Sequence, residues 1–403
     1  MDLEAIRQDF PMLQAKKGQR PVVYLDNACQ TLRPAKVIEV MDRYYRETSA
    51  CGGRSMHRLA NEVARQYEAA RASVARFLNA SRKEEIIFTR NTTEGINLVA
   101  NSLPLGKGDV VLIGDKEHNS NLLPWQMLAK RRGIEIRFTR SREDNTFDLD
   151  RLSTLLDERV KLVALGCSSN LDGVTIPAAD IIRKARANGS LVLLDAAQTA
   201  PHQRLDVKSL DVDFVAFSGH KLLGPSGTGV LYGKYKLLEE MPPFMVGGGT
   251  VSSSSYDGCE FLPPPEKFEA GLADYAGVIG LGAAIEYLEE IGFKNIQRQD
   301  LLLNSHLTAG LEGLKRFRIL GPADPEKRGG ILSLAVEGGD PHRIALMLDQ
   351  MAGVMVRSGQ HCVHSWFNAH GLPGSLRASV YFYNTIEEAD IFLNSLRKID
   401  RVL

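Results

Sequence analysis

The chain has 403 residues, more than one hydrophobic core usually serves, so we expect at least two domains and room for a buried site. Lysine plus arginine and aspartate plus glutamate each total 49. This balance excludes the strongly basic surface typical of proteins that bind nucleic acid or anionic membranes. Hydrophobic residues at 44% and charged residues at 24% exclude a disordered or fibrous protein.

The sequence also argues against membrane insertion and export. No apolar run approaches the roughly 20 residues of a membrane-spanning helix. The segment from Met1 to Arg7 is charged and amphipathic, unlike an export signal. The five cysteines are widely spread and form no CxxC pair, which argues against a disulfide framework or a structural zinc site. We therefore expect a reduced, cytoplasmic enzyme.

Short apolar segments alternate with helical segments between about residues 60 and 235. The predicted strands cover residues 85–89, 109–113, 161–165, 191–195, 214–217 and 229–233. The predicted helices cover residues 94–102, a segment ending near 132, and 178–188. Nearly continuous apolar strands separated by helices are typical of a mostly parallel sheet with helices on both faces.

The pattern changes after about residue 240. Glycines, serines and prolines concentrated between residues 247 and 265 predict a long loop. The elements predicted after it are a helical segment over 277–317 that breaks near Gly292, strands over 331–336 and 376–380, and helices over 341–351 and 386–396. We therefore predict an α/β protein. Its predicted parts are an N-terminal helical segment (1–17) packing with the small domain, a large domain (18–285) and a small α+β C-terminal domain (286–403).

Polar residues follow five of the predicted strands, at the points where those strands end. They are Thr92, Thr93, His118, Asn121, Asn170, Asp195, Gln198, Ser218, His220 and Lys221. Ligands of open α/β sheets bind outside the carboxyl ends of the strands. We therefore expect these side chains to meet at one edge of the sheet.

Lys221 and Asp195 together point to pyridoxal phosphate. Lys221 follows a buried strand among glycines, where loss of hydration lowers an amine's pKa and makes it nucleophilic. Asp195 ends an apolar strand, and a buried carboxylate needs a cationic partner. Pyridoxal phosphate enzymes use a lysine that bonds the cofactor aldehyde and an aspartate that pairs with the pyridinium nitrogen. For Lys221 alone, a solvated loop position is the alternative.

Thr92 and Thr93 suggest a phosphate site. Either threonine can cap a helix that starts at Glu94, and the backbone N–H groups at such a helix start suit a phosphate. A simple helix cap is the alternative, and it would be favoured for this segment alone. The neighbouring Lys221 and Asp195 shift the interpretation to the cofactor phosphate.

Several segments resemble a known enzyme family. Residues 194–198 (Leu-Asp-Ala-Ala-Gln) and 217–221 (Phe-Ser-Gly-His-Lys) resemble the cofactor segments of class V aminotransferase-fold (fold type I) pyridoxal phosphate enzymes. Within that family, the segments that resemble cysteine desulfurases and selenocysteine lyases are residues 92–97, 117–125 and 383–385. Residues 357–362 (Arg-Ser-Gly-Gln-His-Cys) resemble the catalytic cysteine loop of SufS-type, or group II, enzymes. The resemblance extends over essentially the whole chain.

The resemblance implies fold type I, with a cofactor-binding large domain and a small domain that carries the cysteine loop. It implies pyridoxal phosphate as the cofactor, no metal, and catalytic roles for Lys221, Cys362 and His118. The implied cofactor-binding residues are Thr92, Thr93, His118, Asn170, Asp195, Gln198, Ser218, His220 and Lys221. The implied substrate-binding residues are Asn27, Arg54, Asn170 and Arg377.

The implied activity is removal of sulfur from L-cysteine, giving L-alanine and a persulfide on Cys362, for iron–sulfur cluster or related sulfur-transfer biosynthesis. The implied partners are a second copy in a homodimer and a SufE- or SufU-like sulfur acceptor or scaffold protein. Selenocysteine lyase, another β-eliminase or an epimerase on the same fold are alternatives, as is a non-catalytic scaffold. A Rossmann dehydrogenase is excluded because no GxGxxG opens a strand–helix unit.

A few positions depart from the family pattern or stay open. Gly53 and Asn119 stand where SufS-type sequences carry histidine, and Leu272 replaces a threonine that usually reaches the partner subunit's phosphate. Cys29 and Cys51 lie in segments that resemble active-site loops, so each is a candidate for lining the pocket but not the expected sulfur acceptor.

Overall fold

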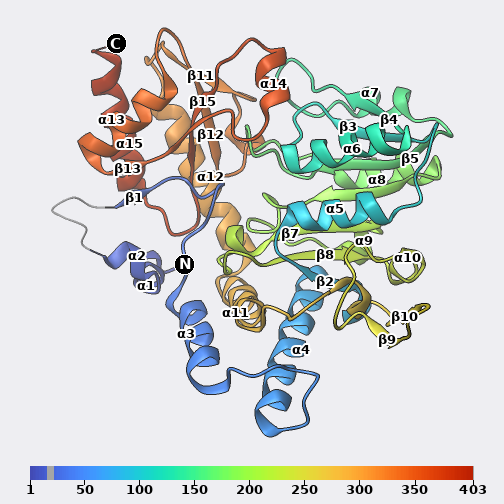
Figure 1. Ribbon diagram of the computed structural model, residues 1–403. Coiled ribbons are helices and arrows are strands. Elements are labelled where there is room, and N and C mark those ends of the chain that lie inside the picture. The colour runs from blue at the N-terminus through green and yellow to red at the C-terminus, as the bar shows by residue number, and fades with distance from the viewer. Residues whose placement is uncertain (16–21, 403) are drawn as a thin grey trace.

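A seven-stranded sheet forms the centre of the larger part of the molecule (Figure 1). The computed structural model describes residues 1–15 and 22–402. The strand order is β2 (Ile86–Thr89), β8 (Gly229–Gly233), β7 (Phe214–Ser218), β6 (Leu191–Asp195), β5 (Val160–Gly166), β3 (Val110–Gly114) and β4 (Glu135–Thr139). Only β8 runs against the other six strands of this sheet. The predicted, mostly parallel sheet is therefore confirmed.

Helices cover both faces of this sheet because its strands are apolar on both sides. Val110 and Leu112 of β3 belong to one core, and Val111 and Ile113 belong to the other, as the two-residue period of a strand requires. The first core includes residues of α4 (Arg58–Leu78), α7 (Leu149–Leu155), α8 (Ala178–Ala187) and α11 (Tyr275–Ile291). The second includes residues of α5 (Thr92–Ser102), α6 (Asn119–Arg132) and α10 (Tyr235–Glu240).

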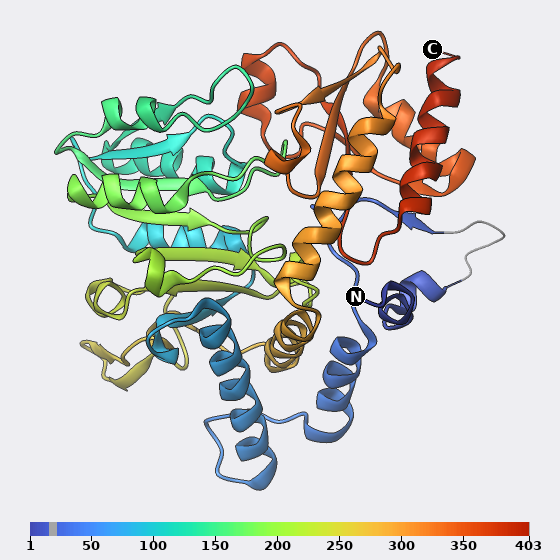
Figure 2. The same ribbon diagram turned by 180° about the vertical axis from the view of Figure 1, so that it is seen from behind.

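A four-stranded antiparallel sheet forms the C-terminal part. Its order is β11 (Phe317–Leu320), β12 (Ile331–Val336), β15 (Ser375–Ser379) and β14 (Arg357–Gly359). The apolar core on one face is shared with α12 (Phe293–Gly310), α13 (Pro341–Ala352) and α15 (Ile386–Asp400). The short helix α14 (His364–Ala369) packs Trp366 and Phe367 into a separate cluster. Figure 2 shows α12 running from α11 alongside this sheet and α15.

The N-terminal segment connects to both parts of the molecule. It comprises α1 (Leu3–Gln8), α2 (Pro11–Gln14), β1 (Val23–Tyr24) and α3 (Ala35–Arg43). Arg7 forms an ion pair with Glu388 of α15 at 2.8 Å, and Phe10 packs against Tyr287 of α11. The strand β1 pairs in parallel with β13 (Val354–Met355) of the C-terminal part.

The predicted limits of the three parts of the chain, 1–17, 18–285 and 286–403, stay a prediction. Residues 16 and 17 of the predicted N-terminal segment and 18–21 of the large domain lie outside the described residues. The predicted start of the small domain at residue 286 falls inside the continuous helix α11. The helical break lies six residues later, at Gly292, which has a φ of +82°.

Several segments differ from the sequence-based prediction. The helical segment predicted to reach residue 317 ends at Gly310, and Phe317 begins the strand β11 after a turn in which Gly313 has a φ of +86°. The predicted long loop contains an antiparallel hairpin, β9 (Val251–Ser254) and β10 (Cys259–Phe261). The edge strand β4 was not predicted, although its alternating polar and apolar residues are typical of a half-buried strand.

The carboxyl ends of the parallel strands point toward the C-terminal part of the molecule (Figure 1). This arrangement places the loops after β2, β3, β5, β6 and β7 opposite the segment around β14 and β15. None of the described helices combines the length and the apolar character needed to cross a membrane.

Candidate active site

A cavity of about 300 Å³ lies where those loops meet the C-terminal part. The residues predicted to follow the five strands line it, except Asn121, which is fully buried behind the cavity wall. The lining residues among the predicted set are Thr92, Thr93, His118, Asn170, Asp195, Gln198, Ser218, His220, Lys221, Cys362 and Arg377. The expected convergence on one sheet edge is therefore confirmed.

Lys221 and Asp195 form the charged centre of the cavity. Burial lowers the pKa of Lys221, and Asp195 acts in the opposite direction. Burial raises the pKa of Asp195, although the backbone N–H of Ala197 donates to its carboxylate at 3.0 Å. Among the described residues, no ion pair engages either side chain. A reactive amine and a buried carboxylate that form no direct ion pair thus face the same space.

Hydroxyl groups and a helix start line another side of the cavity. Thr92 and Ser218 share a hydrogen bond between their hydroxyls at 2.6 Å, and Ser218 Oγ accepts from the Thr92 backbone N–H. Thr93 Oγ1 lies 2.7 Å from Ser120 Oγ. Hydroxyl groups beside the start of a helix suit a phosphate.

The predicted start and cap of the helix α5 were wrong. The helix starts at Thr92, not Glu94, and its cap is Asn91, whose side chain accepts from the Glu94 backbone N–H at 3.0 Å. Asparagine is a stronger N-cap than threonine, which favours Asn91 over the two threonines that follow it. Because Asn91 caps the helix, Thr92 and Thr93 are free to face the cavity.

Two histidines line the cavity as neutral rings. Burial lowers the pKa of His118 to about 3, with Lys221 and Arg377 adding to the effect. The Nδ1 atom of His118 accepts from the Ser120 backbone N–H at 3.1 Å, which orients the ring at the start of α6. Burial also lowers the pKa of His220, to about 4. A neutral imidazole can stack on a flat ring or exchange a proton with a group in hydrogen-bond reach of its ring nitrogens.

Amide and guanidinium groups border the cavity on the side of the C-terminal part. Arg377 is 2% exposed and donates through Nη1 to the carbonyl of Asn170 at 2.8 Å. Its Nη2 lies 3.4 Å from Asp26, and its buried Nε has no partner among the described residues. Gln198 donates to the carbonyl of Ala28 at 2.7 Å. An arginine fork with a spare donor suits a carboxylate ligand.

The cysteine loop has an unusual backbone. His361 and Cys362 have φ values of +49° and +60°, a region that residues other than glycine rarely adopt. Hydrogen bonds hold both carbonyls: Asn170 donates to His361 at 2.7 Å, and the Asn119 backbone N–H donates to Cys362 at 2.8 Å. His361 Nε2 pairs with Ser375 at 2.7 Å. The surrounding structure thus fixes Cys362 at the cavity wall.

Two predicted substrate-binding residues do not line the cavity. Asn27 is buried and hydrogen bonds with Tyr383 and Asn384, in a network that joins the N-terminal segment to the C-terminal part. Arg54 is exposed and donates to the carbonyl of Gly271 at 3.1 Å. Cys51 also lies outside the cavity, 3.9 Å from the Tyr275 hydroxyl.

Three lining residues were not assigned roles from the sequence. Arg357 was noted only as part of the cysteine loop, and Cys29 only as a candidate for lining the pocket. Glu117 precedes His118 and accepts three hydrogen bonds while fully buried. Glu117 precedes the N-cap of α6, so no helical spacing in the sequence marks its hydrogen bond with Asn121.

The family model "Aminotransferase class-V" matches residues 23–392 of the chain. The chain belongs to this family. The chain is 40% identical to a probable cysteine desulfurase of Xylella fastidiosa (strain 9a5c) over 405 residues. This alignment covers 100% of the chain and 96% of that protein.

Solved structures support the same assignment. The apo structure of a cysteine desulfurase from Thermococcus onnurineus NA1 is similar, with a TM-score of 0.94 and 38% sequence identity. The similarity covers 99% of the present chain and 98% of the Thermococcus chain. The cysteine desulfurase CsdA from Escherichia coli is similar with a TM-score of 0.92 and 35% identity, over 100% and 99% of the two chains. These likenesses confirm the predicted family and the fold type I architecture.

Proposed function

We propose that this chain is a pyridoxal phosphate-dependent cysteine desulfurase, which removes sulfur from L-cysteine and leaves L-alanine and a persulfide on Cys362. The observation that carries the proposal is that Lys221, Asp195 and Cys362 line one cavity. An aminotransferase or a dehydrogenase would have no use for a thiol held at this wall. The names of the full-length relatives support the same activity.

The donor set fits pyridoxal phosphate. Lys221 offers a free amine for the cofactor aldehyde, and Asp195 offers a buried carboxylate for the ring nitrogen. The residues that would hold the phosphate are Thr92, Thr93, Ser218 and His220. His118 would stack on the ring, and Asn170 and Gln198 would lie near its hydroxyl and the substrate. When bound, the cofactor supplies an electron sink that stabilises negative charge on the substrate Cα.

Three residues of the chain then act on the substrate, one by binding it and two by transferring protons. Arg377 binds the substrate carboxylate through its fixed guanidinium fork and its free Nε donor. The amine of Lys221, with its lowered pKa, takes the proton from the substrate Cα. His118 is neutral and can accept or donate a second proton near the sulfur.

Cys362 is the sulfur acceptor in this proposal. Its thiolate attacks the substrate sulfur, and an S–S bond forms on Cys362 while the Cβ–S bond of the substrate breaks. The electron pair of the broken bond stays with the substrate carbon skeleton, which is protonated to alanine. The loop contacts of Asn170 and Asn119 hold the cysteine backbone in place during the attack. Preorganising the nucleophile in this way lowers the entropy cost of the reaction.

The proposal also extends to assembly and subtype. The loop sequence 357–362 supports the SufS-type group. Apolar side chains are exposed near the contact of Arg54 with Gly271, where Leu272 is 70% and Met56 91% exposed. A second copy covering this surface would bury them and give the expected homodimer. A SufE- or SufU-like carrier would then collect the persulfide sulfur.

The activity is tested with L-cysteine and two matched variants of the holoenzyme. Cys362→Ala should keep the cofactor's visible absorbance but form no persulfide and little sulfide, and Cys51→Ala, which lies outside the cavity, should react like the wild type. Full desulfurase turnover by Cys362→Ala would contradict the proposal. Turnover by that variant on selenocysteine alone would instead identify a selenocysteine lyase, because selenide is the better leaving group.

A further inference from the structure

A second cysteine lines the cavity together with Cys362. Cys29 lies in the loop after β1, and its backbone N–H donates to the carbonyl of Asp26 at 3.1 Å. The neighbouring carbonyl of Ala28 is held by Gln198 at 2.7 Å. The backbone around Cys29 is therefore fixed, and its thiol is partly accessible from the cavity.

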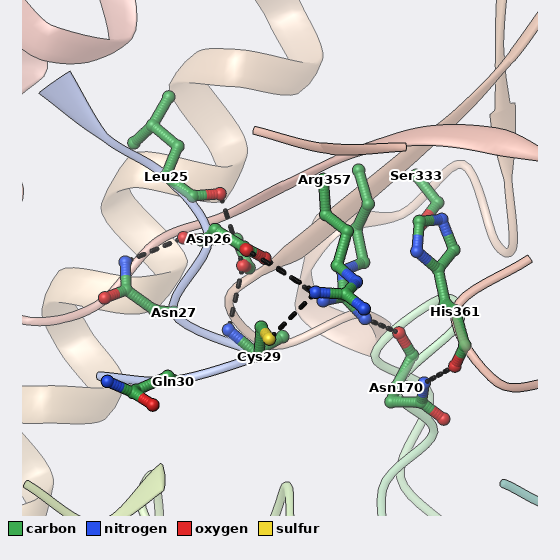
Figure 3. A network of polar contacts seen from close by, with 12 residues as sticks. Leu25, Asp26, Asn27, Cys29, Gln30, Asn170, Ser333, Arg357 and His361 are labelled. Atoms are coloured by element: carbon green, nitrogen blue, oxygen red, sulfur yellow. Dashed lines mark hydrogen bonds and ion pairs between the residues drawn. The ribbon is translucent and has the colours of Figure 1, made fainter. Parts of the chain in front are cut away.

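The sulfur of Cys29 contacts a guanidinium group (Figure 3). Arg357 Nη1 donates to Cys29 Sγ at 3.0 Å and lies 4.0 Å from the carboxylate of Asp26. Asp26 also faces Arg377, so one carboxylate balances two guanidinium groups. A guanidinium stabilises a neighbouring sulfur anion more than a neutral thiol. The surplus of positive charge suits anionic sulfur in this corner.

The other cysteines have different surroundings. Cys167 is buried in the apolar core, where burial raises its pKa to about 11. Cys51 faces Tyr275 outside the cavity, and Cys259 is exposed in the β9–β10 hairpin. Among the five cysteines, Cys29 and Cys362 alone line the cavity beside Lys221. Filling space in an apolar core does not explain Cys29, because its sulfur contacts a charged group.

We propose that Cys29 is a second sulfur carrier of the active site, which receives the outer sulfur of the Cys362 persulfide. This inference rests on the proposed function, since that reaction supplies the persulfide. Both thiols open on one cavity, and the extra S–S bond of a persulfide extends the reach of Cys362 by about 2 Å. The contact with Arg357 would hold the Cys29 sulfur in place for the transfer.

The transfer is a thiol exchange without net oxidation. The Cys29 thiolate attacks the outer sulfur of the persulfide, and an S–S bond forms on Cys29 while the S–S bond to Cys362 Sγ breaks. The electron pair of the broken bond leaves on Cys362, which becomes a thiolate again. The persulfide proton stays on the transferred sulfur. Cys362 can then accept a second sulfur, so one chain holds two sulfurs before an external acceptor arrives.

The test maps added sulfur on each cysteine of the holoenzyme. The protein is incubated with L-cysteine without reductant, alkylated at once, digested and measured by mass spectrometry. We expect the wild type to carry sulfur on Cys362 and Cys29, and Cys29→Ser to carry it on Cys362 only, which halves the maximum load. Cys51→Ser, the matched control, should match the wild type. Cys362→Ser should carry sulfur on neither cavity cysteine.

The contact with Arg357 gives a second readout. Arg357→Lys keeps a positive charge but loses the fork, and the ratio of sulfur on Cys29 to sulfur on Cys362 should fall several-fold. Bound-cofactor absorbance confirms that each variant is folded. A loaded Cys362 with Cys29 unmodified would overturn the relay and leave the proposed function standing. Sulfur on Cys29 in Cys362→Ser would overturn the route through Cys362, and no sulfur on either residue of the wild type would overturn both proposals.

Discussion

The carboxylate of Glu117 accepts a hydrogen bond from the backbone N–H of Gly166 at 3.0 Å. It also accepts from the Gly114 backbone N–H at 3.3 Å and from Asn121 Nδ2 at 2.7 Å. Gly114 ends β3 and Gly166 ends β5, so one buried side chain joins the carboxyl ends of two strands. His118 follows directly, and its position in the cavity depends on this junction.

Glu117 should make the free energy of unfolding depend on pH. Burial raises its pKa from 4.5 to about 7, against the opposing hydrogen bonds. The folded chain therefore binds a proton that the unfolded chain has lost, and the resulting stabilisation, present below pH 4.5, is lost as the pH rises through 7. The loss amounts to about 3 kcal/mol. Glu117→Gln should lack this dependence.

Denaturant unfolding of the wild type and Glu117→Gln at several pH values between 5 and 8 measures this effect. The advantage of the wild type over the variant should shrink as the pH rises. A constant difference across this range would show that the carboxyl of Glu117 does not titrate there.

His118 should act as a neutral ring. Because its pKa is lowered to about 3, the ring carries no proton near neutral pH. His118→Gln should lower kcat by about 100-fold through loss of stacking and proton exchange. The acidic side of the pH–rate profile should keep its position, because His118 does not titrate in that range. A shift of that side in the variant would contradict the neutral state.

Arg377→Lys should weaken substrate binding and turnover together. Lysine keeps the charge but cannot reproduce the Nη1 contact with the Asn170 carbonyl and also offer a fork to the substrate carboxylate. Loss of one charge-assisted hydrogen bond costs about 2 kcal/mol, or roughly 30-fold in kcat/KM for L-cysteine. Steady-state kinetics check this, and unchanged kcat/KM would remove Arg377 from the substrate site.

The backbone of Cys362 should be strained. Its φ of +60° suits glycine. The free energy of unfolding of Cys362→Gly should therefore be about 1 kcal/mol higher than that of Cys362→Ala. Neither variant carries the thiol, so the comparison isolates the backbone. Denaturant unfolding of both proteins measures the difference. Equal stability, or a more stable alanine variant, would contradict the strain.

Much of the fold was predictable because its signals are local. The strands β6 and β7 are apolar almost throughout, and their predicted limits match the structure to within one residue. The sheet edge at which Asp195 and Lys221 meet followed from topology alone. The antiparallel direction of β8 was not predictable, because a strand buried on both faces reads the same in either direction.

The site was predictable where a residue follows a strand and less so where it comes from the C-terminal part. Asn27 was expected at the substrate, but its amide satisfies Tyr383 and Asn384 instead, a contact across more than 350 positions that no local pattern reveals. Arg357 and Cys29 meet over a similar separation. Such pairs are set by the packing of the two parts of the molecule.

The central claim is that Lys221 bonds the cofactor aldehyde beside Asp195. Reduction of the holoenzyme with borohydride makes such a bond permanent, and peptide mapping then identifies the modified lysine. We expect the pyridoxyl group on Lys221 in the wild type and on no lysine in Lys221→Ala. A label on another lysine, or an unlabelled wild-type protein that contains the cofactor, would contradict the account.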